Sequence, residues 1–290
     1  MVEVITTVEE MQRRAEELRQ AGRRIACVPT MGFFHDGHLS LMRIARRRAA
    51  VLVVTIFVNP AQFGPGEDFE TYPRNPKRDI ELCAAEKVDI VFTPATADLY
   101  PDGYQSYVTL KHLPHHLCGL SRPVFFTGVA TVVGKLFNII RPHTAVFGEK
   151  DYQQLLVIRR LVKDLNFNIE IIGAPIVREN DGLAMSSRNA YLTPDQRPAA
   201  LTLSHALGQA GQRVEAGERD AARILKEARD LIAAHPENDI DYLTICDPET
   251  LIQVEHIDRP VLMALAVKVG KTRLIDNTIL AAAASGDQLF

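Results

Sequence analysis

The sequence predicts an α/β fold with a parallel sheet in its first part and a smaller α+β region in its second. In the first part, short apolar runs alternate with amphipathic stretches, which is the pattern of βαβ units. The run Val51–Val58 is rich in β-branched residues, as in a strand buried on both faces. This alternation ends near Ile176, where a turn-rich stretch begins. We therefore expect a Rossmann-like domain over residues 1–176 and a C-terminal α+β lid domain over residues 177–290.

Each element is expected from a local pattern, with helices where apolar residues recur every three or four positions and strands where apolar runs are short. The expected helices are Val8–Gln20, His38–Ala50, Asn75–Glu86, Val129–Ile140, Asp151–Leu165, Ala199–Glu215 and Asp220–Ala234. The expected strands are Arg24–Pro29, Val51–Val58, Val88–Phe92, Thr144–Phe147, Asn168–Ile172, Ile240–Ile245 and Val261–Val267. Two long loops, Asn59–Pro76 and Thr93–Pro123, are of a length that usually serves a function. The last residues, 281–290, are expected to fray.

Composition and charge exclude several classes of protein. The chain has 290 residues, of which 47% are hydrophobic, and a net charge of −3, so we expect a folded protein without bulk attraction to nucleic acid or membranes. The four cysteines have no CxxC spacing, and the beginning of the chain has no apolar secretory segment. Reduced thiols and a cytoplasmic location are therefore expected.

The segment Pro29–His38 is the most informative motif, because it joins an expected strand to an expected helix through a glycine-containing turn. The first amides of a helix are unpaired and attract anions, and Gly37 lets a phosphate approach the backbone. His35 and His38 flank this glycine and add two hydrogen-bond donors. We interpret the segment as a phosphate-binding turn of an ATP-using enzyme; the alternative is an ordinary capped turn.

Three further motifs follow expected strands or lie in the turn-rich junction. In Phe147–Gln154, Lys150 is a point charge for phosphate, Asp151 a helix cap or ribose acceptor, and Gln154 a group that reaches a hydroxyl or carboxylate. The polar segment Met185–Asn189 offers two hydroxyls and a guanidinium to phosphate oxygens. After the strand Val51–Val58, Asn59 and Gln62 are amides suited to a hydroxy acid.

Several other motifs are discounted. The run Gly270-Lys271-Thr272 lacks the earlier glycine of a P-loop, and no dinucleotide-binding or serine-nucleophile motif is present. No metal site is predicted, because the group of His112, His115, His116 and Cys118 has no common zinc spacing.

Taken together, the motifs resemble those of the pantothenate synthetase (pantoate–β-alanine ligase) family, within the wider His-x-Gly-His nucleotidyltransferase superfamily. The resemblance spans residues 4–277. It is carried by six segments in register: Val28–His38, Ile56–Phe63, Tyr72-Pro73-Arg74, Phe147–Gln154, Asp181–Asn189 and Thr272–Asn277.

The resemblance implies a two-step reaction. Pantoate carboxylate attacks the α-phosphate of ATP, which gives pantoyl adenylate and pyrophosphate, and β-alanine then displaces AMP to form pantothenate. It also implies Mg²⁺ with the triphosphate and a homodimer. Because no residue becomes covalently attached, the enzyme must position its substrates and stabilise charge.

The same resemblance assigns roles to residues. His38, His35 and Lys150 would be catalytic, with His38 as the proton donor, and Gln62, Gln154 and Asn59 would bind the acid substrate. The ATP site would comprise Met31, Gly32, Phe33, Phe34, His35, Asp36, Gly37, His38, Gly148, Glu149, Lys150, Asp151, Val177, Met185, Ser186, Ser187 and Arg188. Val177 would contact adenine.

The sequence departs from the family at Val124 and Phe125, where glycine and histidine are usual. The loss of glycine would stiffen a turn that needs a positive φ, and the loss of histidine bears on how β-alanine is handled. Two other functions remain open: an adenylyltransferase for a phosphopantetheine-like substrate, and a nucleotide-binding regulator without catalysis. Gln62 and Gln154 argue against the first, since a phosphorylated acceptor would require more basic residues.

Overall fold

The computed structural model describes residues 2–281, so the expected fraying of the chain end lies outside the described residues from 282 onward. The described chain forms two compact units. The first extends to His115 and resumes over Arg122–Val177, and the second comprises His116–Ser121 and the chain from Arg178. A functional division at residues 176 and 177 stays a prediction.

The first unit is built on a parallel sheet that has six strands within the described residues, in the order β1-β4-β3-β2-β5-β6. These strands are β1 (Glu3–Ile5), β2 (Ile25–Thr30), β3 (Val51–Ile56), β4 (Ile90–Phe92), β5 (Thr144–Gly148) and β6 (Glu170–Ala174). From β2 the chain proceeds outward to β3 and β4, and it then returns to place β5 on the other side of β2. The strand order therefore reverses between β2 and β5, which is where open α/β sheets bind their ligands.

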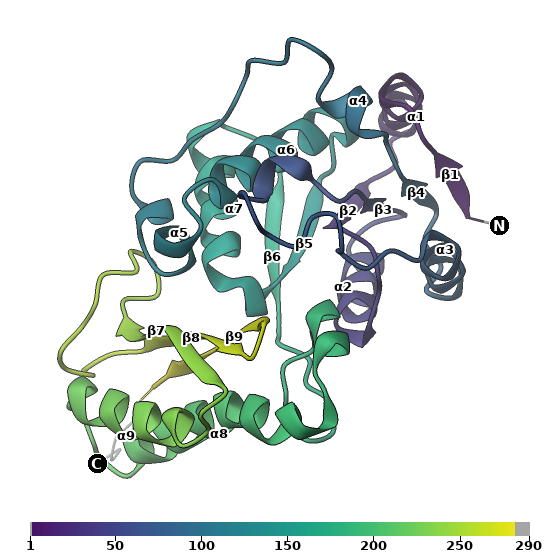
Figure 1. The fold of residues 1–290 in the computed structure, drawn as a ribbon. Coiled ribbons are helices and arrows are strands. Elements are labelled where there is room, and N and C mark those ends of the chain that lie inside the picture. Colours follow the sequence, from purple (N-terminus) through teal and green to yellow (C-terminus); the bar gives the residue numbers. More distant parts are fainter. Residues whose placement is uncertain (1, 282–290) are drawn as a thin grey trace. The chain divides into compact units, whose positions relative to one another are not determined.

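Helices cover both faces of this sheet, with α2 on one side of β5 and β6 and with α6 and α7 on the other (Figure 1). Buried side chains of α2 and α3 share one core cluster with the inner strands, while α6 packs between α1 and α7. The helices of this unit are α1 (Val8–Gln20), α2 (Asp36–Arg46), α3 (Pro76–Ala85), α4 (Thr96–Leu99), α6 (Phe125–Ile140) and α7 (Tyr152–Asp164). Short 3₁₀ turns are η1 (Pro60–Gln62), η2 (Leu113–His115) and η3 (Glu149–Asp151).

The second unit is an antiparallel sheet, in the order β7-β8-β9, with α8 and α9 packed against it (Figure 1). Its elements are β7 (Asn238–Cys246), β8 (Val261–Val269), β9 (Thr272–Leu280), α5 (Cys118–Ser121), α8 (Arg197–Glu215), α9 (Ala221–Ala233), η4 (Ser187–Tyr191) and η5 (Pro194–Gln196).

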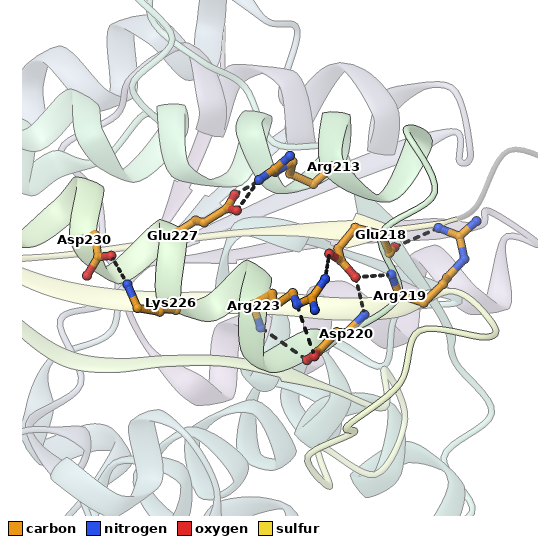
Figure 2. A network of polar contacts seen from close by, with 8 residues as sticks. All are labelled: Arg213, Glu218, Arg219, Asp220, Arg223, Lys226, Glu227 and Asp230. Atoms are coloured by element: carbon orange, nitrogen blue, oxygen red, sulfur yellow. Dashed lines mark hydrogen bonds and ion pairs between the residues drawn. The ribbon is translucent and has the colours of Figure 1, made fainter.

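Charged side chains tie α8 to α9 on the solvent side of this unit (Figure 2). Arg213 pairs with Glu227 across the two helices at 2.7 Å, and Lys226 pairs with Asp230 one turn along α9. Because these side chains are exposed, water and salt screen the pairs, and the apolar cluster beneath the helices contributes more to stability.

The predicted fold class is confirmed, and most of the expected elements are present with ends displaced by a few residues. Two strands were not predicted. The strand β1 has only three residues, and β9 carries the polar residues Arg273, Asp276 and Asn277 within an otherwise apolar run. Helix α6 begins at Phe125, four residues before the expected Val129. Val124 has a φ of −90°, so the expected strain at this position is wrong: the turn here needs no glycine.

Candidate active site

The ends of β2 and β5 place the two phosphate motifs beside one another. The residue pairs Ala26–Thr144 and Cys27–Ala145 join these strands in parallel, so both strands end at the same edge of the sheet. The segment 31–38 follows β2, and η3 with Lys150 follows β5. Lys150 lies near enough to the His38 ring for its positive charge to lower the pKa of that ring. The point where the strand order reverses thus carries histidine, lysine and the N-terminus of α2.

The turn that leads into α2 is held by a residue that the sequence did not single out. Asp79, which is only 1% exposed, accepts hydrogen bonds from the backbone N–H groups of Phe33 and Phe34 at 2.7 and 2.8 Å. Phe33 has a φ of 51°, and Gly32 has a φ of 82°. A Cβ at Gly32 would come within 2.9 Å of the Asp79 carboxylate, so glycine is required here by space as well as by conformation. Asp79 therefore fixes the shape of the phosphate turn.

Phe34 was expected to line the ATP site, and the structure gives it a supporting role. Its side chain is buried in the core, its N–H is bonded to Asp79, and its carbonyl accepts from Arg78 at 3.1 Å. Asp36 and Gly37 open α2, where the first backbone N–H groups have no partners inside the helix. Their position agrees with a site for an anion at this helix end.

His35 and His38 lie against each other, with ring centroids 4.1 Å apart. The backbone N–H of His35 donates to Nδ1 of His38 at 3.4 Å. Burial lowers the pKa of His38 well below its ordinary value, and the charges of His35 and Lys150 lower it further. The His38 ring is therefore neutral at pH 7. Because Nδ1 accepts, the proton of the neutral ring is on Nε2, which can donate to a phosphate oxygen.

The predicted acid-binding residues begin at η1, which follows β3. Gln62 is buried there, and its Nε2 approaches the Met31 sulfur at 3.0 Å, so η1 and the phosphate turn are in contact. Asn59 donates from Nδ2 to Gln62 Oε1 at 3.2 Å and to the Gly128 carbonyl at 3.1 Å. Both Asn59 donors are thus used inside the protein. Asn59 orients Gln62, and a direct contact between Asn59 and a substrate stays a prediction.

Helix α6 supports η1 from its N-terminal end. A Cβ at Gly128 would overlap the Ala61 carbonyl oxygen, so the two segments pack as closely as backbones can. Arg122 donates to the Gln62 carbonyl at 3.2 Å, and its guanidinium forms a two-point pair with Glu67. That guanidinium also lies over the ring of Phe125, 4.0 Å from the ring centroid. Phe125, where the family resemblance led us to expect histidine, therefore serves to hold Arg122 in place.

The remaining predicted residues of this unit lie along η3 and α7. Glu149 packs over Gly173 of β6, where a Cβ would come within 2.8 Å of its carboxylate. Asp151 is exposed, and Gln154 is half-buried in the first turn of α7. Its neighbour Gln153 is buried and donates to the Leu113 carbonyl at 2.8 Å, which anchors the loop 93–123 to this helix.

The third motif, Met185–Asn189, belongs to the second unit, where hydrogen bonds shape it. Ser186 caps η4 by accepting from the Arg188 backbone N–H at 3.2 Å. Asn189 donates to Glu179 at 2.6 Å and to the Ala184 carbonyl at 3.1 Å. The phosphate contacts predicted for Met185, Ser186, Ser187 and Arg188 remain predictions, as does the contact of Val177 with adenine.

Among residues 2–281, no group of three or more histidine, cysteine, aspartate or glutamate side chains is arranged to hold a metal ion. Over the same part of the chain, no helix has the length and apolar character that crossing a membrane requires.

The fold and site define an α/β protein in which a glycine-containing turn and a helix N-terminus lie where the strand order reverses, as in nucleotide-binding proteins. Residues 3–279 match the family described as Pantoate-beta-alanine ligase. The chain belongs to this family.

Curated relatives are similar along nearly their whole length. Pantothenate synthetase of Syntrophobacter fumaroxidans is 59% identical over 281 residues, which cover 97% of this chain and 99% of the relative. That of Desulfatibacillum aliphaticivorans is 58% identical over 279 residues, 96% of this chain and 99% of the relative.

Solved structures agree with the fold. Pantothenate synthetase from Thermus thermophilus matches with a TM-score of 0.91 at 41% identity, covering 97% of this chain and all of that one. Pantoate–β-alanine ligase from Francisella tularensis, complexed with β-γ ATP and β-alanine, matches with a TM-score of 0.80 at 32% identity. This match covers 96% of this chain and 98% of that one.

Proposed function

We propose that this protein condenses pantoate with β-alanine at the expense of ATP, and that it releases pantothenate, AMP and pyrophosphate. One observation carries the proposal: the ends of β2 and β5 bring His38 and Lys150 near each other, and Met31, in the turn that follows β2, contacts Gln62. A phosphate-binding group and an acid-binding group are then neighbours. Membership of the ligase family, and the nucleotide and β-alanine in the Francisella structure, support the same substrates.

In the first step, a carboxylate oxygen of pantoate bonds to the α-phosphorus while the bond to pyrophosphate breaks. Negative charge grows on the phosphate oxygens, where the Nε2 proton of His38 and the ammonium of Lys150 would stabilise it. Gln62 and Gln154 would hold the acid in line. In the second step, the amine of β-alanine bonds to the acyl carbon, loses a proton and displaces AMP.

The magnesium ion implied by the family would be carried by the nucleotide. Mg²⁺ keeps several water ligands and is usually bound through the phosphates of a nucleotide substrate. The family's homodimer also stays a prediction.

The proposal is tested by incubating the protein with ATP, Mg²⁺, pantoate and β-alanine and measuring AMP and pantothenate by mass spectrometry. ATP–pyrophosphate exchange that depends on pantoate isolates the first step. His38→Asn should lower this exchange by about a hundredfold or more. His205→Asn, which changes an exposed histidine of α8, is the matched control and should retain it.

The same assay separates the two alternatives. Exchange that needs a phosphorylated acceptor in place of pantoate would favour the adenylyltransferase. A rise in melting temperature with ATP, without turnover of any acceptor, would favour the regulator.

A further inference from the structure

The Asn59 amide is saturated by four hydrogen bonds, and the last of them comes from a residue outside the predicted site. Besides its two donations, Asn59 accepts at Oδ1 from the Ala61 backbone N–H at 3.3 Å and from the Tyr100 hydroxyl at 2.8 Å. Asn59 is only 1% exposed, so water cannot replace these partners.

The direction of each hydrogen bond around Asn59 is fixed by which groups can donate and which can accept. The Gly128 carbonyl can only accept and the Ala61 N–H can only donate, so Asn59 must place Nδ2 toward Gly128 and Oδ1 toward Ala61. The Tyr100 hydroxyl must then donate. Because Asn59 Nδ2 donates to Gln62 Oε1, the amide of Gln62 is oriented as well, with Nε2 on the Met31 side.

Aromatic packing holds Tyr100 in position. The Tyr104 ring meets the Tyr100 ring edge-on at 5.0 Å, and the Lys135 ammonium lies over Tyr104, 4.5 Å from its centroid. Phe57, immediately after β3, lies against the Tyr100 ring, with 6.4 Å between the two ring centroids. Burial raises the pKa of Tyr100, so its hydroxyl remains a donor throughout the physiological range.

We propose that Tyr100 is a positioning residue for the acid substrate, which acts through Asn59 to make Gln62 present its NH₂ group. A donor amide suits a carboxylate or hydroxyl oxygen, whereas a reversed Gln62 would direct a carbonyl oxygen at the carboxylate and repel it. This inference rests on the proposed function, since it takes Gln62 as the group that binds the acid.

The kinetic test compares Tyr100→Phe with Tyr107→Phe. Both changes remove one hydroxyl from the same run of tyrosines in edge-to-face contact, but Tyr107, at the outer end of the run, is 56% exposed. Tyr100→Phe should raise the KM for pantoate by about fivefold to tenfold, because Asn59 keeps its bond to Ala61 and loses the other. The KM for ATP should stay within about twofold, and Tyr107→Phe should match wild type. An unchanged pantoate KM, or an equal rise in both KM values with a fall in melting temperature, would overturn the proposal.

A second readout needs no turnover, so it separates failure of this proposal from failure of the proposed function. Side-chain NH₂ signals of Asn59 and Gln62 are identified in ¹H–¹⁵N spectra by their loss in Asn59→Asp and Gln62→Glu. Tyr100→Phe should shift both pairs of signals, and Tyr107→Phe should shift neither. If the signals of Asn59 and Gln62 did not shift in Tyr100→Phe, Tyr100 would not position Gln62 through Asn59, even in an active enzyme. If the signals shifted in a protein that makes no pantothenate, the positioning by Tyr100 would stand and the assigned substrate would be wrong.

Discussion

Arg178 and Asp276 form a two-point ion pair within the second unit, although 98 residues separate them in the chain. The two bonds measure 2.6 and 3.0 Å, and the Asp276 side chain is only 2% exposed. Arg178 also donates to the Gly182 carbonyl at 3.0 Å. The run that ends the family resemblance therefore holds the base of the turn that carries Met185–Arg188.

Replacing Asp276 by Asn should destabilise the protein by about 2–3 kcal/mol, because the buried carboxylate loses its charged bonds to the half-buried Arg178. The measurement is the urea midpoint of unfolding followed by circular dichroism. Glu227→Gln breaks the exposed pair with Arg213 and should leave that midpoint almost unchanged. Equal shifts in the two variants would show that the Arg178–Asp276 pair has no special weight.

Asp79→Asn should weaken both the fold and nucleotide binding. The amide offers one acceptor to the N–H groups of Phe33 and Phe34 where the carboxylate offers two, so one buried N–H faces another donor. We expect a loss of about 1.5–3 kcal/mol in unfolding free energy and weaker ATP binding by calorimetry. Glu81→Gln, on an exposed position of the same helix, is the control. If Asp79→Asn bound ATP as tightly as wild type, Asp79 would have no part in nucleotide binding.

Gly128→Ala and Gly134→Ala place the same methyl group at two positions of α6. A Cβ at Gly134 has open space, so this change should stabilise the helix by up to about 1 kcal/mol. At Gly128 the methyl would displace the Ala61 carbonyl and with it Gln62. We expect a lower melting temperature and a pantoate KM raised about tenfold or more. If both variants behaved alike, close packing of α6 on η1 would be unimportant for the site.

The lowered pKa of His38 makes stability depend on pH in a defined window. The unfolded chain takes up a proton on this ring near pH 6.5, whereas the folded chain resists doing so until a lower pH. Between these values the unfolded state binds more protons. The contribution of His38 to stability is therefore fully present above pH 6.5, and it is lost as the pH falls from 6.5 through the folded pKa. Melting temperatures at pH 7.5 and pH 5.5 should therefore differ more for wild type than for His38→Asn.

His205→Asn should retain the wild-type difference, because this histidine is exposed on α8. The same pH dependence in wild type and His38→Asn would rule out a buried neutral His38.

The sequence correctly predicted that a short turn joins a strand to a helix at residues 31–35 and that Lys150 follows a strand, because strand ends and helix starts carry distinctive residue types over a few positions. It did not reveal Asp79 or Tyr100. Asp79 is 46 residues from Phe33, and Tyr100 is 41 residues from Asn59, so their roles exist only once the chain has folded. One signal was available in the sequence. Asp79 lies on the same face of α3 as Cys83, and a carboxylate on a buried helix face needs hydrogen-bond or charged partners.

Other differences have local causes. Helix α6 was expected to start at Val129, immediately after Gly128. In the structure Gly128 lies inside the helix, where its lack of a side chain serves packing against η1 rather than a turn. A glycine at a tertiary contact and a glycine at a helix end look the same in a single sequence.

The reversal of strand order between β2 and β5 also divides two recognition tasks. The segment 31–38 and Lys150 follow those two strands, whereas Gln62 and its supports come from the end of β3 and from α6. We therefore expect substitutions at the start of α6 to change binding of the acid more than binding of the nucleotide. Variants engineered at these positions should therefore change their preference among acids while their affinity for the nucleotide stays constant.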